Sequence, residues 1–139
     1  MIPIPSLILC VVFLTLSAVH IRWLFGDRHA FEGVVPTRDG EPLFRPGKGS
    51  TLLVAVALAF AAVVSMWRGI CPLVEPAWVP QLGIWVLAAV FVLRAIGDFR
   101  YIGIFKRVRD TRFARNDSLF FSPLCLGISG LAVWLALGY

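Results

Sequence analysis

The chain of 139 residues has few charged residues, only two histidines and three cysteines, and these shortages exclude several kinds of site. The cysteines Cys10, Cys71 and Cys125 lack metal-ligand spacing and cannot all pair, so we interpret them as small apolar packing residues. No phosphate-binding loop, Ser-His-Asp order or pair of carboxylates is visible. The sequence therefore predicts no metal site and no cofactor, and it gives catalysis little support.

What the chain has in excess is apolar surface. Hydrophobic residues make up 59% of the sequence and the mean hydropathy is +0.85, more than one small water-soluble core can bury. The apolar stretches are Ile4 to Leu24, Thr51 to Met66, Val79 to Leu93 and Leu119 to Leu137. Each approaches the roughly 20 residues that cross a hydrocarbon core of about 30 Å. We predict an all-α membrane protein, a four-helix antiparallel transmembrane bundle that forms one domain over residues 1–139.

The predicted helices cover about residues 4–25, 50–67, 79–100 and 118–138. In the first loop, two strand-like pieces about Asp39-Gly40 predict a short β-hairpin at about residues 33–45. We expect the third helix to emerge from the membrane and to continue along its surface as an amphipathic segment. The last helix has two alternative starts, a cap within residues 116–118 followed by a kink at Pro123, or a cap at Ser122.

The lysines and arginines predict how the bundle is oriented. Four lie in the first loop and six in the third, whereas the N-terminus, the second loop and the C-terminus together carry only Arg68. Positively charged loops stay in the cytoplasm, so we expect a multi-pass protein with a cytoplasmic hairpin and with the N-terminus and C-terminus outside.

Arg94 and Asp98 are the strongest candidate site, because they are spaced i,i+4 where an apolar stretch meets the densest basic segment. Ionisable groups at this depth are costly, and Gly97 between them would let another helix come close. The alternative is that Arg94 reaches to the membrane surface and that the pair only fixes the helix end.

His20 lies one turn before Trp23, near the cytoplasmic end of the first helix and at the expected depth of Arg94. Such a histidine can move a proton or bind an anionic group. The alternative is an interfacial hydrogen-bonding residue, because the predicted spans contain no second histidine.

A basic segment with interleaved aromatic residues follows the third span. We predict that it binds anionic headgroups at the membrane surface rather than nucleic acid, because it directly adjoins a span. Its basic residues are Lys106, Arg107, Arg109, Arg112 and Arg115.

Four motifs together resemble a bacterial membrane protein family catalogued as domain of unknown function 3995. They are His20-x-x-Trp23; Val35-Pro36 with Gly40-x-Pro42-x-Phe44-x-Pro46; the block from Arg94 to Tyr101; and the block from Ser122 to Leu126. The resemblance covers almost the whole chain and implies a bacterial cytoplasmic (inner) membrane protein, with a fold but no reaction. The predicted topology places the motifs on the cytoplasmic side, where they would line one pocket under the hairpin.

The leading hypothesis is therefore a binding protein for an anionic small molecule or a lipid headgroup. In it His20, Arg94 and Arg100 hold the anion, Asp98 orients Arg94, and Trp23 closes the pocket with the hairpin. One alternative is an accessory subunit that packs the small residues of its second helix on a membrane-protein partner, and close packing between copies in a homo-oligomer is equally open. A weaker alternative is an interfacial enzyme on lipid or isoprenoid substrates with His20 as base.

Overall fold

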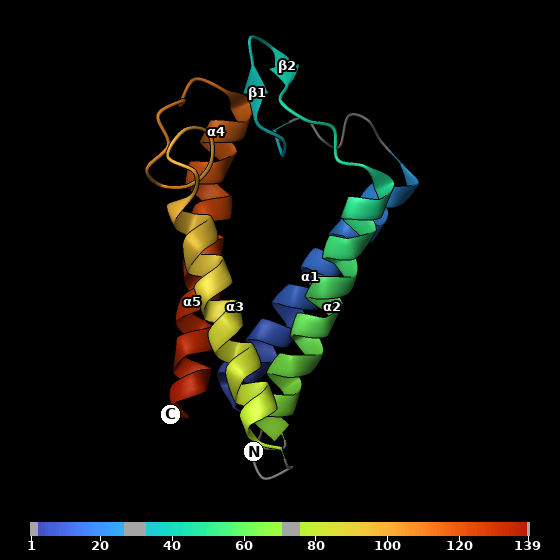
Figure 1. The fold of residues 1–139 in the computed structure, drawn as a ribbon, viewed down its shortest axis with the longest axis vertical. Helices are drawn as coiled ribbons and strands as arrows, with labels where there is room; N and C mark the ends of the chain where they lie inside the picture. Colours follow the sequence, from blue (N-terminus) through green and yellow to red (C-terminus); the bar gives the residue numbers. More distant parts are fainter. Residues whose placement is uncertain (1–2, 27–32, 71–75, 139) are drawn as a thin grey trace.

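Four helical spans, each long and apolar enough to cross a membrane, dominate the computed structural model, which describes residues 3–26, 33–70 and 76–138 (Figure 1). The first three spans are α1 Ile4–Phe25, α2 Lys48–Ile70 and α3 Trp78–Ile96. The fourth is continuous from Arg112 to Leu137 and consists of α4 Arg112–Asn116, the π-helical turn η2 Asp117–Phe121 and α5 Ser122–Leu137. The predicted fold class, a four-helix bundle of membrane type with a small hairpin, is confirmed. Cys71 and the second loop around it lie outside the described residues.

The helices pack as two antiparallel pairs, α1 with α2 and α3 with α5. The pairs meet at the end opposite the hairpin and diverge towards it, so that the ribbon has the outline of a V (Figure 1). Where the pairs meet, Leu9 and Phe13 of α1 and Ile84 of α3 are fully buried, and the rings of Phe13 and Phe91 lie 5.5 Å apart. The core therefore sits in the closed half of the V, and the hairpin end is held by other means.

Serine hydroxyls join the helices of each pair. Ser6 Oγ donates to the carbonyl of Ser65 at 2.8 Å, and Ser17 Oγ to that of Ala55 at 2.8 Å. In the other pair Ser129 Oγ donates to the carbonyl of Ala88 at 2.9 Å. Lipid tails are as apolar as leucine, so helices in a membrane associate through close packing and such hydrogen bonds rather than through the hydrophobic effect.

The small residues of α2 pack against the other helices of the same chain. Ala55, Ala61 and Ala62 are buried, whereas the large side chains of Leu53 and Phe60 are 70% and 66% exposed. The same distribution, small inside and large outside, is expected of a helix that packs on a neighbour and faces lipid on its other side.

The predicted hairpin forms over a shorter range than expected. Strand β1 Thr37–Arg38 pairs antiparallel with β2 Glu41–Pro42. Asp39 and Gly40 between them have φ values of 53° and 84°, the positive angles that a type I′ turn requires. Two residues per strand are marginal alone. The segment that leads into the hairpin is held by the last span, because Asn116 Nδ2 of α4 donates to the carbonyl of Gly33 at 3.0 Å.

Candidate functional site

The end of α3 determines which residues can meet. The helix ends at Ile96 because Gly97 adopts φ +81°, and it does not continue to about residue 100 as predicted. A Cβ on Gly97 would collide with the carbonyl of Ile102, and one on Gly103 with the carbonyl of Ile96. The two glycines therefore let the chain fold back on the helix end rather than admit another helix. The expected helical continuation is wrong, because residues 97–111 form an irregular loop.

Asp98 lies in this loop and does not pair with Arg94 as predicted. Its Oδ1 accepts three backbone N–H bonds, from Arg100 at 2.9 Å, Tyr101 at 2.7 Å and Ile102 at 2.9 Å. Burial raises the pKa of the Asp98 carboxyl, but the backbone donors outweigh it and hold the pKa below its usual value of 3.8. Asp98 therefore closes the loop as a local backbone cap and leaves Arg94 to another carboxylate.

That carboxylate is Asp117, whose side chain is completely buried. Its Oδ1 lies 3.1 Å from Arg94 Nη2, and its Oδ2 lies 3.1 Å from Lys106 Nζ. The backbone N–H of Gly103 also donates to Oδ2 at 2.7 Å. We call Arg94, Lys106 and Asp117 the Asp117 cluster. A buried charge is tolerated only when it is paired and hydrogen-bonded, and this carboxylate has both kinds of partner.

Lys106 differs from the other basic residues of the loop because it is buried. It was predicted on the membrane surface, but its side chain is only 1% exposed. Besides Asp117, its ammonium group donates to the carbonyl of Gly103 at 3.0 Å and to Ser118 Oγ at 2.7 Å. All three protons of the ammonium group are thus hydrogen-bonded, and Lys106 connects the loop to the last span. The other four basic residues of the predicted segment are exposed. They are Arg107, Arg109, Arg112 and Arg115.

The π-helical turn places Asp117 at the core of this cluster. The last span begins at Arg112, where Thr111 Oγ1 accepts from the N–H of Ala114 at 3.0 Å, so neither of the two predicted starts is right. Within η2 the N–H of Ser122 reaches the carbonyl of Asp117, five residues back. Pro123 follows and has no N–H to continue the α-helical ladder. Such turns are rare and occur often at functional sites.

Two donors beside the cluster lack partners among the described residues. They are Nη1 of Arg94 and Oγ of Ser122, and both atoms are buried. Arg94 thus offers Asp117 only one arm of its guanidinium fork. A buried donor without a partner is costly, so this arm is the least satisfied part of the cluster.

His20 and Trp23 lie on α1, on the other helix pair. His20 Nδ1 lies 2.7 Å from the carbonyl of Leu16, which can only accept, so Nδ1 carries a proton and donates it. The rings of His20 and Trp23 are 4.8 Å apart. Arg100 is exposed in the loop with its guanidinium 5.3 Å above the ring of Tyr101. The five predicted ligand residues are therefore distributed over α1, the Asp117 cluster and the loop.

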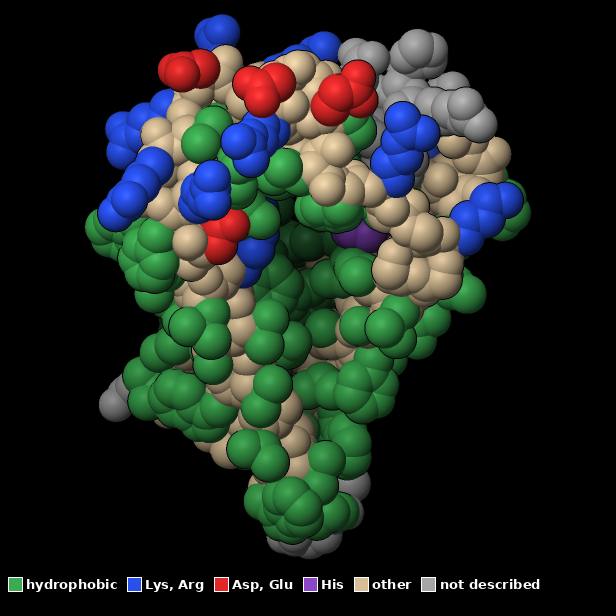
Figure 2. Space-filling model, turned by 45° about the horizontal axis from the view of Figure 1, so that its top comes forward, with side chains coloured by type: hydrophobic (Ala, Val, Ile, Leu, Met, Phe, Trp, Pro, Cys, Tyr) green, Lys and Arg blue, Asp and Glu red, His purple; other side chains and the backbone are tan. Residues whose placement is uncertain are grey.

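A cavity of about 760 Å³ opens under the hairpin, between the end of α1 and the start of α2. Figure 2 shows the hollowed, charged hairpin end of the molecule above its apolar body. Of the five predicted residues, only Trp23 lines this cavity. Aromatic and apolar side chains form most of its wall, and two cations also line it. The lining residues include Trp23, Phe25, Val35, Phe44, Arg45 and Lys48.

Sequence reasoning missed Asp117, Arg45 and Lys48. The sequence indicates Asp117 only as a helix cap, although an acidic residue two positions before the apolar run that begins at Leu119 is itself a signal for a functional or structural ion pair. Arg45 and Lys48 are two of the four basic residues in the first loop, which by their charge indicate only the orientation of the bundle. No sequence pattern shows that they border a cavity, because the hairpin that covers it is placed by a contact with Asn116, far along the chain.

No curated protein and no solved structure matches the chain. A family model does match residues 13–132, which overlap all four spans and include every residue of the Asp117 cluster. The chain therefore belongs to the family described as "Protein of unknown function (DUF3995)".

Proposed function

We propose that this protein binds an anionic amphiphile in the cavity under the hairpin. The observation that carries the proposal is the composition of the cavity wall. Among the described residues it combines the aromatic side chains of Trp23, Phe25 and Phe44 with Arg45 and Lys48 and contains no carboxylate. Ligand sites are concave and mostly apolar with a few polar groups that fix orientation, and a volume of about 760 Å³ lies within their usual range.

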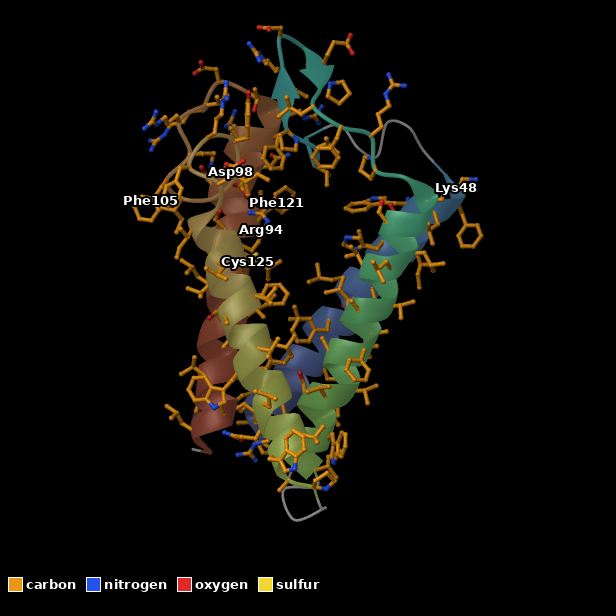
Figure 3. All side chains as sticks on the ribbon, viewed as in Figure 1. Lys48, Arg94, Asp98, Phe105, Phe121 and Cys125 are labelled. Atoms are coloured by element: carbon orange, nitrogen blue, oxygen red, sulfur yellow. The ribbon has the colours of Figure 1, made fainter. Side chains whose placement is uncertain are left out.

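The two cations are suited to different parts of one headgroup. The guanidinium of Arg45 is a planar fork that matches two oxygens of a phosphate or carboxylate, and Lys48 supplies a compact charge. Lys48 is the first residue of α2 (Figure 3), and both side chains are exposed. The apolar part of the ligand would lie against Trp23 and Phe44. The ring of His20 lies against Trp23 and supports its position.

The predicted topology supports an amphiphile rather than a soluble anion. The cavity lies at the end of spans long and apolar enough to cross a membrane, next to the basic loops. By the positive-inside rule this end faces the cytoplasm, so the ligand would come from the inner leaflet or the cytoplasmic interface.

In this proposal Arg94 is a positioning residue and not a ligand. Arg94 helps to fix the position of Asp117. Asn116, which precedes Asp117 in the sequence, donates to the carbonyl of Gly33 and so holds the segment that leads into the hairpin. The Asp117 cluster would thereby hold the cover of the cavity in place. This role differs from the one expected from the sequence, in which Arg94 itself held the anion.

Native mass spectrometry of protein extracted gently from its own membrane tests the proposal. We expect a bound small mass in the wild type and its loss in the double variant Arg45→Gln/Lys48→Gln. Arg38→Gln is the matched control, because Arg38 is an exposed hairpin arginine that does not line the cavity. A double variant that keeps the ligand at wild-type stoichiometry would refute the proposal. A protein-sized partner bound equally to all three would favour an accessory subunit instead.

A further inference from the structure

The loop of residues 97–111 presents apolar side chains to the outside of the bundle. Phe99, Ile104 and Phe105 are 58%, 45% and 59% exposed, and the rings of the two phenylalanines lie 6.2 Å apart. Phe105 projects sideways from the hairpin end, away from the helices (Figure 3). These side chains are not the continuation of an amphipathic helix, so a different explanation for their exposure is needed.

The loop holds these rings in a fixed arrangement. Phe99 has φ +62°, a conformation that a bulky side chain rarely adopts and that must be imposed by its surroundings. Asp98 imposes it by accepting the N–H groups of Arg100, Tyr101 and Ile102, and Lys106 ties the far side of the loop to Asp117. The aromatic pair is thus ordered before it meets any partner, which lowers the entropy cost of binding.

The exposed charges around the aromatic pair are mainly positive. Arg100, Arg107 and Arg109 are exposed, whereas the charge of Lys106 is matched inside by Asp117. The two loop carboxylates, Asp98 and Asp110, are exposed as well, and Oδ1 of Asp98 is engaged by backbone donors. The surface therefore combines protruding aromatic rings with an excess of guanidinium groups.

We propose that this surface binds the headgroup of an anionic phospholipid in the surrounding bilayer. The loop begins directly after α3, a helix apolar and long enough to cross a membrane, so the rings of Phe99 and Phe105 lie at the boundary of its apolar part. Aromatic rings favour the interface between headgroups and acyl chains. The arginines beside them then bind the lipid phosphate. This site shares no residue with the cavity under the hairpin.

Electron spin resonance in nanodiscs of phosphatidylcholine and phosphatidylglycerol tests the inference. The readout is the preference of the protein for spin-labelled phosphatidylglycerol over spin-labelled phosphatidylcholine. We expect Arg100→Gln/Arg107→Gln to weaken this preference roughly 25-fold, since each basic residue near an anionic surface contributes a factor of about five. We also expect Phe105→Ser to reduce the contact with both labelled lipids.

Two matched controls keep the result interpretable. Arg38→Gln removes an exposed arginine from the hairpin, and Phe120→Ser removes a side chain that is 67% exposed on the last span. Neither is expected to change the lipid preference. If Arg38→Gln and the double variant lose the preference for phosphatidylglycerol equally, the preference depends only on the net charge of the protein, and the inference is overturned. An unchanged preference in the double variant would also overturn the inference. This includes the case in which a protein extracted together with this chain covers Phe105. Arg45→Gln/Lys48→Gln should keep the preference, so the two proposals can fail separately.

Discussion

Replacing Asp117 by asparagine should destabilise the protein more than any other single loss of charge in the described chain. The substitution keeps the size of the side chain but leaves Lys106 Nζ, whose side chain is 1% exposed, without a counter-charge. Arg94 Nη2 loses its carboxylate as well. Breaking a buried ion pair from one side typically costs about 3–5 kcal/mol, because the remaining charge stays buried. We expect the free energy of unfolding of Asp117→Asn to fall by about this amount.

The assay is reversible unfolding in mixed micelles, followed by tryptophan fluorescence as the fraction of denaturing detergent increases. Asp39→Asn is the control, because Asp39 is 93% exposed and lies 3.6 Å from an exposed arginine, so its loss should change the free energy of unfolding by less than about 1 kcal/mol.

A second substitution separates the ion pair from other effects of Asp117. Replacing Lys106 by methionine in the Asp117→Asn background removes the unpaired ammonium, so the double variant should be less destabilised than the sum of the two single variants. If Asp117→Asn is no less stable than Asp39→Asn, or if the two single effects add fully, the cluster does not hold the loop and the reasoning is refuted.

Three further predictions concern the loop and the helix pairs. Gly97→Ala should lower the free energy of unfolding by at least about 2 kcal/mol, because Gly97 has φ +81° and backbone fills the space of a Cβ, whereas Gly127→Ala enters open space and should not. Asp98 has a lowered pKa in the folded state, so its stabilisation is present above pH 3.8 and is lost as the pH falls through the folded pKa; unfolding of Asp98→Asn should lack this part of the pH dependence. Ser129→Ala removes a hydrogen bond of 2.9 Å to Ala88 and should cost about 0.6 kcal/mol in the same unfolding assay.

Much of the fold could be predicted because its signals are local. A run of about 20 apolar residues must be helical in a bilayer, since no water is available there to satisfy the backbone. The Asp39-Gly40 pair predicted the turn for a similar reason, because few residues adopt two successive positive φ angles. Each of these inferences needs only neighbouring residues.

The candidate site was predicted less well because its contacts are not local. The spacing of Arg94 and Asp98 indicates a pair only if the helix continues, and Gly97 ends it. Arg94 then meets Asp117, 23 residues further along the chain. Lysine is ordinarily a surface residue, and Lys106 is buried only because Asp117 neutralises the charge of its ammonium group.

The sequence by itself determined the number of spans, the segregation of basic residues into two loops and the hairpin turn, because hydropathy, charge and turn chemistry act over a few residues. Only the tertiary structure decided which carboxylate Arg94 meets, which lysine is buried and which cations border the cavity. Those choices depend on how far apart the two helix pairs stand and on how the π-helical turn orients Asp117. Such geometry arises from packing over the whole chain, and no short stretch of residues encodes it.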